Sequence, residues 1–266
     1  MEEFNLIHLR LTPAFLFPKT LMESMDYLAK RAVSCRGMSV EALNDKTMRQ
    51  FAIGDIHGCL TSLQRLDHEL AFGDGDTVVT LGDYVDRGPD SRGVIEFLLD
   101  LRKRCRLVAL RGNHEIMMLR ARDDRSWLLN WIACGGDSTL DSYGAAGFQD
   151  VPAAHWDFIA GTVRYCETED DFFVHANALA DLPLEDQPAF NLFWEHLGAV
   201  VSPHVSGRRM ICGHTRQKSG LPLDLGRAVC IDTNACGGGW LTCLETGSGM
   251  YWQANQQGDL RRGSLK

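Results

Sequence analysis

The stretch FAIGDIHG, residues 51–58, begins as an apolar run typical of a buried strand and ends in a carboxylate and an imidazole. Asp55 and His57 lie two positions apart, directly after the run. Asp55 alone is explained equally well as the cap of a following helix. His57 alone is explained as a hydrogen-bonded loop histidine. The stretch therefore raises the question of whether these polar side chains serve the fold or a functional site.

The same arrangement recurs twice along the chain, as GDYVDRG (82–88) and GNHE (112–115). Residues 59–81 separate the first two motifs, and a segment of equal length, 89–111, separates the second from the third. Two equal strand–helix–strand steps would place the three motifs along one edge of a sheet, where ligand sites of α/β proteins lie. The residues gathered there would be Asp55, His57, Asp83 and Asn113. Singly, Asn113 would be explained by a turn and Asp83 and Asp86 as solvated loop acids; these explanations leave the repetition unexplained.

The rest of the chain also predicts α/β architecture. Helical spacing of apolar residues marks 60–70 and 91–104, between the strand-like runs of the three motifs. Further β-rich runs, with fewer long helices between them, follow at 170–176, 208–215, 227–234 and 239–246.

The first 47 residues differ from the remainder of the chain, with a short helix expected near Leu21–Arg31 and no clear strand. We expect residues 1–47 to be an extension that is dispensable or weakly ordered, and residues 48–266 to form one catalytic domain. An ordinary docked N-terminal helix is the alternative.

Composition limits the class of protein. The 266 residues are 45% hydrophobic and carry a formal net charge of −8, which offers no basic footprint for a nucleic acid. No apolar run approaches the roughly 18 residues of a membrane span, and the chain opens with the acidic MEEF rather than a basic leader. The nine cysteines include no Cys-x-x-Cys pair, which argues against a disulfide framework and a structural zinc site. We expect a cytoplasmic protein without membrane or nucleic-acid partners; the oligomeric state is left open.

Two later apolar runs end in histidine, at His175 and His214. With the three motifs they complete a set of two Asp, one Asn and three His, which suits Mn²⁺, Fe or Zn²⁺ better than an all-oxygen Ca²⁺ site. Six ligands fit two ions that share a bridging ligand, for which Asp83 is the natural residue. Such ion pairs activate a bridging water for in-line attack on phosphorus.

The motifs GDxHG, GDxVDRG and GNHE, in this order, resemble those of the phosphoprotein phosphatase branch of the calcineurin-like metallophosphoesterases, especially the compact bacterial and bacteriophage lambda-type protein phosphatases. The resemblance runs from about Met48 to Trp252. It implies a central β-sandwich flanked by α-helices. It also implies two divalent ions, with Mn²⁺ as the first expectation, one held by Asp55, His57 and Asp83 and the other by Asp83, Asn113, His175 and His214.

The resemblance further implies that His114 is the general acid, that Asp86 holds it, and that Arg87 binds the substrate phosphate. A serine or threonine alkoxide is a poor leaving group, so its departure is assisted by a proton donor opposite the attacking water. A carboxylate such as Asp86 would fix the tautomer of that histidine. Two divalent ions would make the site positive despite the negative net charge of the chain. Asn113 and His196 complete the expected phosphate contacts.

Three positions depart from the pattern of the relatives. Asn177 and Asn234 stand where glycine is expected, and asparagine tolerates positive φ best among the other residues. His196 stands where relatives tend to carry a second phosphate-binding arginine. Arg208 and Arg209 are candidate substitutes, but both begin the strand that leads to His214 and are expected at the surface. We therefore expect weaker phosphate binding than in an arginine-bearing relative.

The predicted function is a metal-dependent serine/threonine protein phosphatase acting on a phosphoprotein or phosphopeptide. The alternative is a symmetrical diadenosine tetraphosphatase, which typically lacks the second Asp of the middle motif and has Asp in place of Glu115. A catalytically dead phospho-binding module is disfavoured because all six ligands are present. Residues 123–144 are expected at the rim of the substrate groove, with Trp127 and Trp131 packed in the core.

Overall fold

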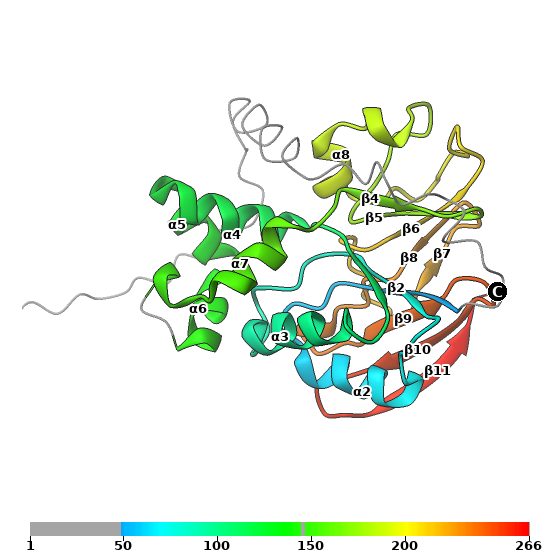
Figure 1. The fold of residues 1–266 in the computed structure, drawn as a ribbon. Helices are drawn as coiled ribbons and strands as arrows, with labels where there is room; N and C mark the ends of the chain where they lie inside the picture. The colour runs from blue at the N-terminus through cyan, green and yellow to red at the C-terminus, as the bar shows by residue number, and fades with distance from the viewer. Residues whose placement is uncertain (1–48, 145–146, 266) are drawn as a thin grey trace, which may run out of the picture.

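Two β-sheets form the centre of the computed structural model, which describes residues 49–144 and 147–265 (Figure 1). One sheet has six strands in the order β11-β10-β9-β1-β2-β3, and the other has five in the order β4-β5-β6-β8-β7. Helices lie outside the sheets. The predicted α/β class and flanked sandwich are therefore confirmed.

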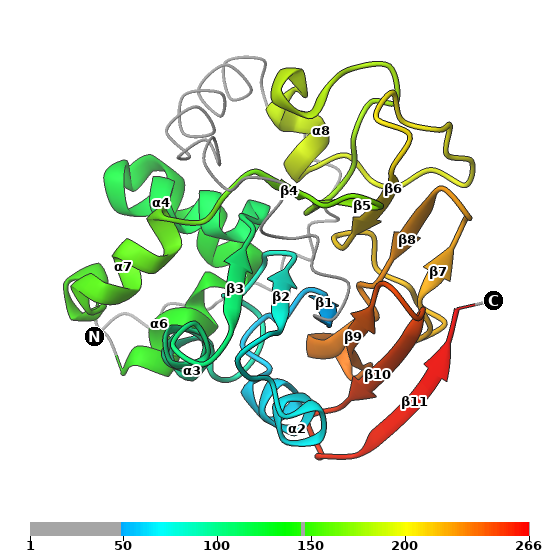
Figure 2. The ribbon, with the colours of Figure 1, turned by 45° about the vertical axis from the view of Figure 1, so that its right-hand side comes forward.

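The three motif strands lie side by side in the six-stranded sheet. β1 (Gln50–Ile53), β2 (Thr77–Thr80) and β3 (Arg106–Ala109) are parallel, and Ile53, Thr80 and Ala109 are partners at their carboxyl ends. The helices α2 (Leu60–Leu70) and α3 (Ser91–Leu101) connect them, as the apolar spacing predicts. The residues that follow the three strands therefore start from one edge of the sheet (Figure 2).

Antiparallel strands from the end of the chain extend this sheet beyond β1. These are β9 (Leu241–Glu245), β10 (Met250–Ala254) and β11 (Leu260–Ser264), and β9 pairs directly with β1. The amino-terminal and carboxyl-terminal parts of the described chain thus build one sheet together.

The five-stranded sheet has a parallel centre. β5 (Asp171–Val174), β6 (Arg209–Cys212) and β8 (Ala228–Cys230) run in the same direction, while β4 (Tyr165–Glu167) and β7 (Leu223–Asp224) pair antiparallel at the edges. His175 and His214 come just after β5 and β6, so they too leave from carboxyl strand ends.

A layer of apolar side chains joins the sheets. Ala52, Val79 and Val108 from the first sheet form one buried cluster with Phe173, Ile211 and Val229 from the second. Strand side chains alternate between faces, so every second residue can enter this layer. At ~25 cal/mol per Å² of buried apolar area, such a layer is a major source of folding free energy.

The helices cover the outer faces of the sandwich. Leu63, Leu66 and Leu70 of α2 are buried against the six-stranded sheet, in a cluster that also holds residues of α3. α4 (Asn113–Asp123), α5 (Leu128–Trp131), α6 (Asp137–Tyr143) and α7 (Ala153–Ala160) group together (Figure 1), beyond the edge strand β3 (Figure 2). α8 (Ala189–Phe193) packs on the five-stranded sheet.

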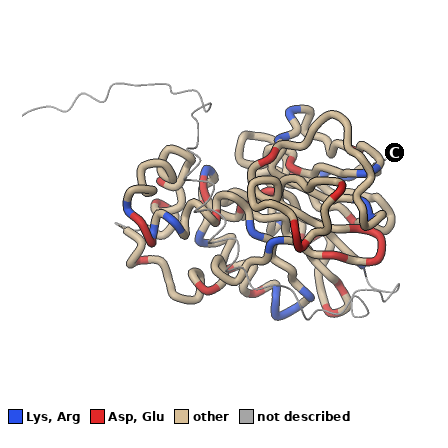
Figure 3. The backbone as a smooth tube through the Cα atoms, turned by 90° about the horizontal axis from the view of Figure 1, so that it is seen from above, with Lys and Arg blue, Asp and Glu red and all other residues tan. Residues whose placement is uncertain are grey.

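The expected extension and its helix near Leu21–Arg31 lie outside the described residues. Among the described residues, none of the helices combines the length and the apolar character needed to span a membrane. Basic and acidic residues are interspersed along the described chain (Figure 3).

Candidate active site

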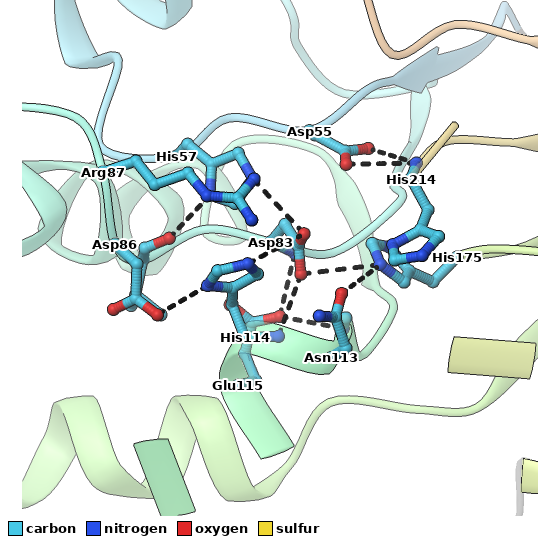
Figure 4. Close-up of polar contacts among 12 residues, drawn as sticks. Asp55, His57, Asp83, Asp86, Arg87, Asn113, His114, Glu115, His175 and His214 are labelled. Atoms are coloured by element: carbon cyan, nitrogen blue, oxygen red, sulfur yellow. Dashed lines mark hydrogen bonds and ion pairs between the residues drawn. The ribbon is translucent and has the colours of Figure 1, made fainter. Parts of the chain in front are cut away.

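The candidate site lies where the carboxyl ends of both sheets meet (Figure 4). Asp55 follows β1, and Asp83 and Asn113 follow β2 and β3. The alternative interpretation of Asp55 as a helix cap is wrong, because α2 begins after Cys59. Both carboxylate oxygens of Asp55 instead accept from the backbone N–H of His214, at 3.1 Å. Asp55 therefore links the two sheets across the site.

Asp83 lies at the centre of the group. Its Oδ2 is 3.3 Å from His57 Nε2, and its Oδ1 is 3.5 Å from His175 Nε2. Two groups with metal-ligand spacing share this residue: His57, Asp83 and His114 form one, and Asp83, His175 and His214 form the other. Burial acts to raise the pKa of Asp83, but the four surrounding histidines hold it below its ordinary value. This position between two groups is the one expected of a bridging ligand.

The second sheet contributes His175 and His214, whose rings lie 5.0 Å apart. Asn113 Oδ1 is 3.0 Å from His175 Nε2. A side chain at Gly213 would collide with Asp55 Oδ1, so the close approach of β6 to the site requires glycine there. The structure thus brings together all six residues predicted as metal ligands.

The histidine ring nitrogens are arranged for metal binding. Nδ1 of His57 and of His175 donate to the carbonyl oxygens of Val85 and Leu81, at 2.9 and 2.8 Å, which makes each Nε2 the acceptor nitrogen that can bind a metal. His214 bonds through the other nitrogen, with Nε2 3.2 Å from Trp194 O. Metal-binding histidines characteristically donate their second N–H in this way.

The charges of the site also favour a cation. Burial lowers the pKa of His57 and of His175, and burial together with His175 lowers that of His214 to about 3, so these rings stay neutral as ligands must be. Burial raises the pKa of Asp55, and the carboxylates of Asp232 and Asp83 raise it further. Grouping buried carboxylates is costly unless positive charge compensates them. The residues present therefore fit two divalent ions.

His114 differs from the other buried histidines. Its Nδ1 lies 2.6 Å from Asp86 Oδ2, and its fully buried Nε2 has no hydrogen-bond partner among the described residues. Burial acts to lower the pKa of His114, but Asp83 and Asp86 outweigh it and raise the pKa above the ordinary value. A protonated imidazole with a free N–H is what a general acid requires.

Arg87 lies at the rim of the site. Its guanidinium is exposed, and Nη1 is 2.9 Å from His57 Nε2. The side chain thus reaches the predicted metal ligand His57 from the solvent side.

The backbone of the site is conformationally unusual. Among the described residues, the non-glycine positions with positive φ include His57, Asp83, Asp86, Arg87 and His214. Each such conformation costs of order 1–3 kcal/mol for a non-glycine residue and persists only where surrounding contacts impose it. Five of the seven such positions in the described chain are therefore candidate functional residues.

The departures from the family pattern have different outcomes. Asn234 has φ 65°, as predicted. Asn177 is not among the positive-φ residues of the described chain, and its side chain accepts from Ala178 N at 2.8 Å and donates to His196 O at 3.3 Å, so asparagine is accommodated there without positive φ.

His196 lies at the site, exposed and stacked on the ring of His214 at 4.8 Å. The candidate substitutes are elsewhere: Arg208 and Arg209 form ion pairs with Glu167 and Asp171 at the start of β6.

Three residues near the site were not predicted as site residues. Asp232 follows β8 as the other acids follow their strands. Arg216 is exposed and lies two residues after His214, and its positive charge acts to lower the pKa of Asp232, which burial raises. The same position after an apolar run was the signal that would have identified Asp232. Trp131, predicted only as a core residue, is fully buried but also donates its indole N–H to Asp86.

This chain belongs to the calcineurin-like phosphoesterase family, whose model matches residues 48–217. Members of this hydrolase family use a dinuclear metal centre, and the grouped ligands around Asp83 agree with that.

Relatives of two kinds are similar to parts of the chain. It is 41% identical over 88 residues to serine/threonine-protein phosphatase 1 of Salmonella typhimurium, covering 33% of this chain and 38% of the relative. It is 40% identical over 73 residues to the symmetrical bis(5'-nucleosyl)-tetraphosphatase of Pectobacterium carotovorum, covering 27% of this chain and 25% of that protein. The matches thus span less than half the length of either relative.

A crystal structure of a putative diadenosine tetraphosphatase has the same fold, with a TM-score of 0.60 at 19% identity, covering 84% of this chain and 96% of that one.

Proposed function

We propose that the protein is a metal-dependent serine/threonine protein phosphatase that hydrolyses phosphate monoesters, and that residues 48–266 form its catalytic domain. The observation that carries the proposal is the pairing of His114 with Asp86 at 2.6 Å beside the ligand group of Asp83. This pair supplies a proton donor next to a site suited to a phosphate. Hydrolysis of an alkyl phosphate ester needs both, because the alkoxide leaving group must be protonated.

The six predicted ligands would hold two ions that share Asp83. Asp55, His57 and Asp83 would hold one ion, and Asp83, Asn113, His175 and His214 the other. Two divalent ions would attract the phosphate and lower the pKa of a bound water. The mixture of carboxylate, amide and imidazole ligands suits Mn²⁺, with Fe and Zn²⁺ as alternatives.

The chain's own residues would then orient the substrate. Arg87 is the exposed guanidinium that contacts the ligand group through His57, so it would bind the phosphate oxygens, and Asn113 and His196 would line the same position. Histidine is shorter than arginine and only partly charged near neutral pH. We add Arg216 as a further phosphate contact: it is exposed, lies two residues after His214 and, among the described residues, its guanidinium has no ion-pair partner.

The proton transfer follows from the position of His114. Water attacks phosphorus, the bond from phosphorus to the serine or threonine oxygen breaks, and His114 Nε2 gives its proton to that oxygen. Asp86 holds the imidazolium through Nδ1. Proton donation of this kind is typically worth roughly 10² to 10⁴ in rate.

The rival function is symmetrical hydrolysis of dinucleoside polyphosphates, which the Pectobacterium carotovorum relative's name states for that protein. A nucleotide leaving group departs as a stable phosphate anion and has little need of a proton. The His114–Asp86 pair therefore favours the protein phosphatase.

A substrate panel decides between the two. Phosphoserine, phosphothreonine and phosphotyrosine peptides are compared with diadenosine tetraphosphate, each with added Mn²⁺, Fe²⁺ or Zn²⁺ and after chelation. The proposal predicts the highest kcat/KM on phosphoserine or phosphothreonine peptides and no turnover after chelation. Preference for diadenosine tetraphosphate would establish the rival, and activity that survives chelation would contradict the metal site.

A further inference from the structure

The Asp86 carboxylate receives three side-chain donors. Besides His114 Nδ1 at Oδ2, the indole N–H of Trp131 lies 2.9 Å from Oδ2 and 3.0 Å from Oδ1, and the hydroxyl of Thr139 donates to Oδ1 at 2.7 Å. Asp86, Trp131 and Thr139 are all fully buried. Trp131 and Thr139 belong to α5 and α6, far from Asp86 in the sequence.

The backbone of Asp86 is held by the same segment. Its N–H is 2.8 Å from Thr139 Oγ1 and 3.1 Å from Ser91 Oγ, and φ at Asp86 is 72°. The neighbouring Arg87 N–H donates to Gly135 O at 3.0 Å. Gly135 has φ 104°, and a Cβ there would lie 2.8 Å from the Arg87 side chain, so only glycine allows this approach. The turn between α5 and α6 thus fits against Asp86 and Arg87.

The indole N–H has a specific effect on the carboxylate. A terminal carboxylate torsion is broad and roughly two-fold, so Asp86 would otherwise rotate with little resistance. An N–H that bridges both oxygens, together with a hydroxyl on Oδ1, fixes the carboxylate plane and leaves Oδ2 directed at His114 Nδ1. Because a small displacement of a catalytic group lowers the rate strongly, this orientation matters for proton transfer.

We propose that Trp131 and Thr139 are positioning residues that orient Asp86, and through it His114, so that the α5–α6 segment controls hydrolysis of esters with poor leaving groups. The inference rests on the proposed role of His114 as general acid. It does not depend on whether the natural substrate is a phosphoprotein.

The test compares two aryl phosphates on the full-length, Mn²⁺-loaded protein. Phenyl phosphate has a poor leaving group that needs a proton, and 2,4-dinitrophenyl phosphate has a good one that does not. Trp131→Phe keeps an aromatic ring in the core and removes the N–H. Thr139→Val keeps the shape and removes the hydroxyl, whereas Thr139→Ser restores it.

The matched control is Trp127→Phe. Trp127 is a buried tryptophan directly before α5, but its ring packs under the Arg120 guanidinium, at 4.7 Å, rather than on Asp86. Thermal melting and bound metal are measured for every variant, so that a folding defect is recognised.

The expected result is a loss of kcat on phenyl phosphate of about 10-fold for Trp131→Phe and for Thr139→Val, as for a lost hydrogen bond to a charged group. KM and metal content stay unchanged, 2,4-dinitrophenyl phosphate turnover changes by less than about 3-fold, and Thr139→Ser restores activity. In a His114→Asn background, Trp131→Phe has little further effect, since residues that act through one group are not additive.

Equal losses on both aryl phosphates, or full additivity with His114→Asn, would overturn the positioning role. If Trp131→Phe does not fold, the Thr139→Val and Thr139→Ser pair decides by the same criteria. Failure of the protein phosphatase assignment has a separate signature: the wild type would hydrolyse phenyl phosphate but not phosphopeptides.

Discussion

Glu115 Oε2 lies 2.8 Å from the backbone nitrogen of Asp83. The same oxygen accepts from Gly112 N, and Oε1 accepts from Tyr84 N, each at 2.8 Å. A buried carboxylate thus holds the backbone of the central ligand in its positive-φ conformation. Burial and the nearby Asp83 raise the pKa of Glu115 to about 7, although the three N–H donors oppose this.

Glu115→Gln should therefore destabilise the protein. If the amide nitrogen replaces Oε2, it faces two backbone donors, and leaving such buried groups unsatisfied costs about 1–3 kcal/mol each. Chemical denaturation should show a lower free energy of unfolding than for Glu69→Gln, a control that loses only a surface ion pair with Arg65. Equal stability of the two variants would mean that Glu115 does not hold the loop.

His114→Asn separates the general acid from the metal ligands. His114 has ligand spacing to Asp83 and His57, so geometry alone permits either role. The proposed role predicts unchanged bound metal and a kcat on phosphoserine peptide lowered by roughly 10² to 10⁴. Elemental analysis beside steady-state kinetics checks both values, and loss of metal comparable to that of His57→Ala would place His114 among the ligands.

His214 gives the chelated protein a pH-dependent stability. Its pKa falls to about 3 in the folded state because the ring is buried and lies near His175, whereas an unfolded histidine titrates near its ordinary value of about 6.5. The unfolded chain therefore takes up the proton first, and the stabilising contribution is lost as pH falls from about 6.5 towards 3. In EDTA, wild type should lose stability relative to His214→Gln over this range. A constant difference between their melting temperatures would contradict the shift.

Phosphate affinity should depend on Arg216 and His196, which both lie near His214. Arg216→Ala should raise KM for a phosphopeptide with little change in kcat, because it removes an exposed positive charge. Arg208→Ala is the matched control, since that guanidinium pairs with Glu167 away from the site. His196→Arg should lower KM. If Arg216→Ala matches the control, or if His196→Arg leaves KM unchanged or raises it, the proposed contact is wrong.

The sequence alone was sufficient to predict the strands that precede Asp55, Asp83 and Asn113 and the gathering of these side chains. Equal spacing and parallel direction place such residues at one edge without knowledge of side-chain contacts. His175 and His214 needed the resemblance for their partners, because a pairing between two sheets leaves no local periodicity.

The contacts of Trp131, Thr139 and Arg216 were beyond sequence reasoning for a different reason. A tryptophan within an apolar helix has the same pattern whether its N–H is satisfied by the aspartate that pairs with His114 or by another group. The backbone contacts of Asn177 were out of reach for a similar reason, since asparagine bonds neighbouring backbone groups as readily as it adopts positive φ.

The bound metal per chain tests the central claim, a pair of ions that share Asp83, most directly. We predict two divalent ions per wild-type chain after Mn²⁺ loading and gel filtration, and one or none for Asp83→Asn, while Asp157→Asn on the exposed side of α7 keeps two. A wild-type chain that binds a single ion, or an Asp83→Asn chain that still binds two, would contradict the shared centre.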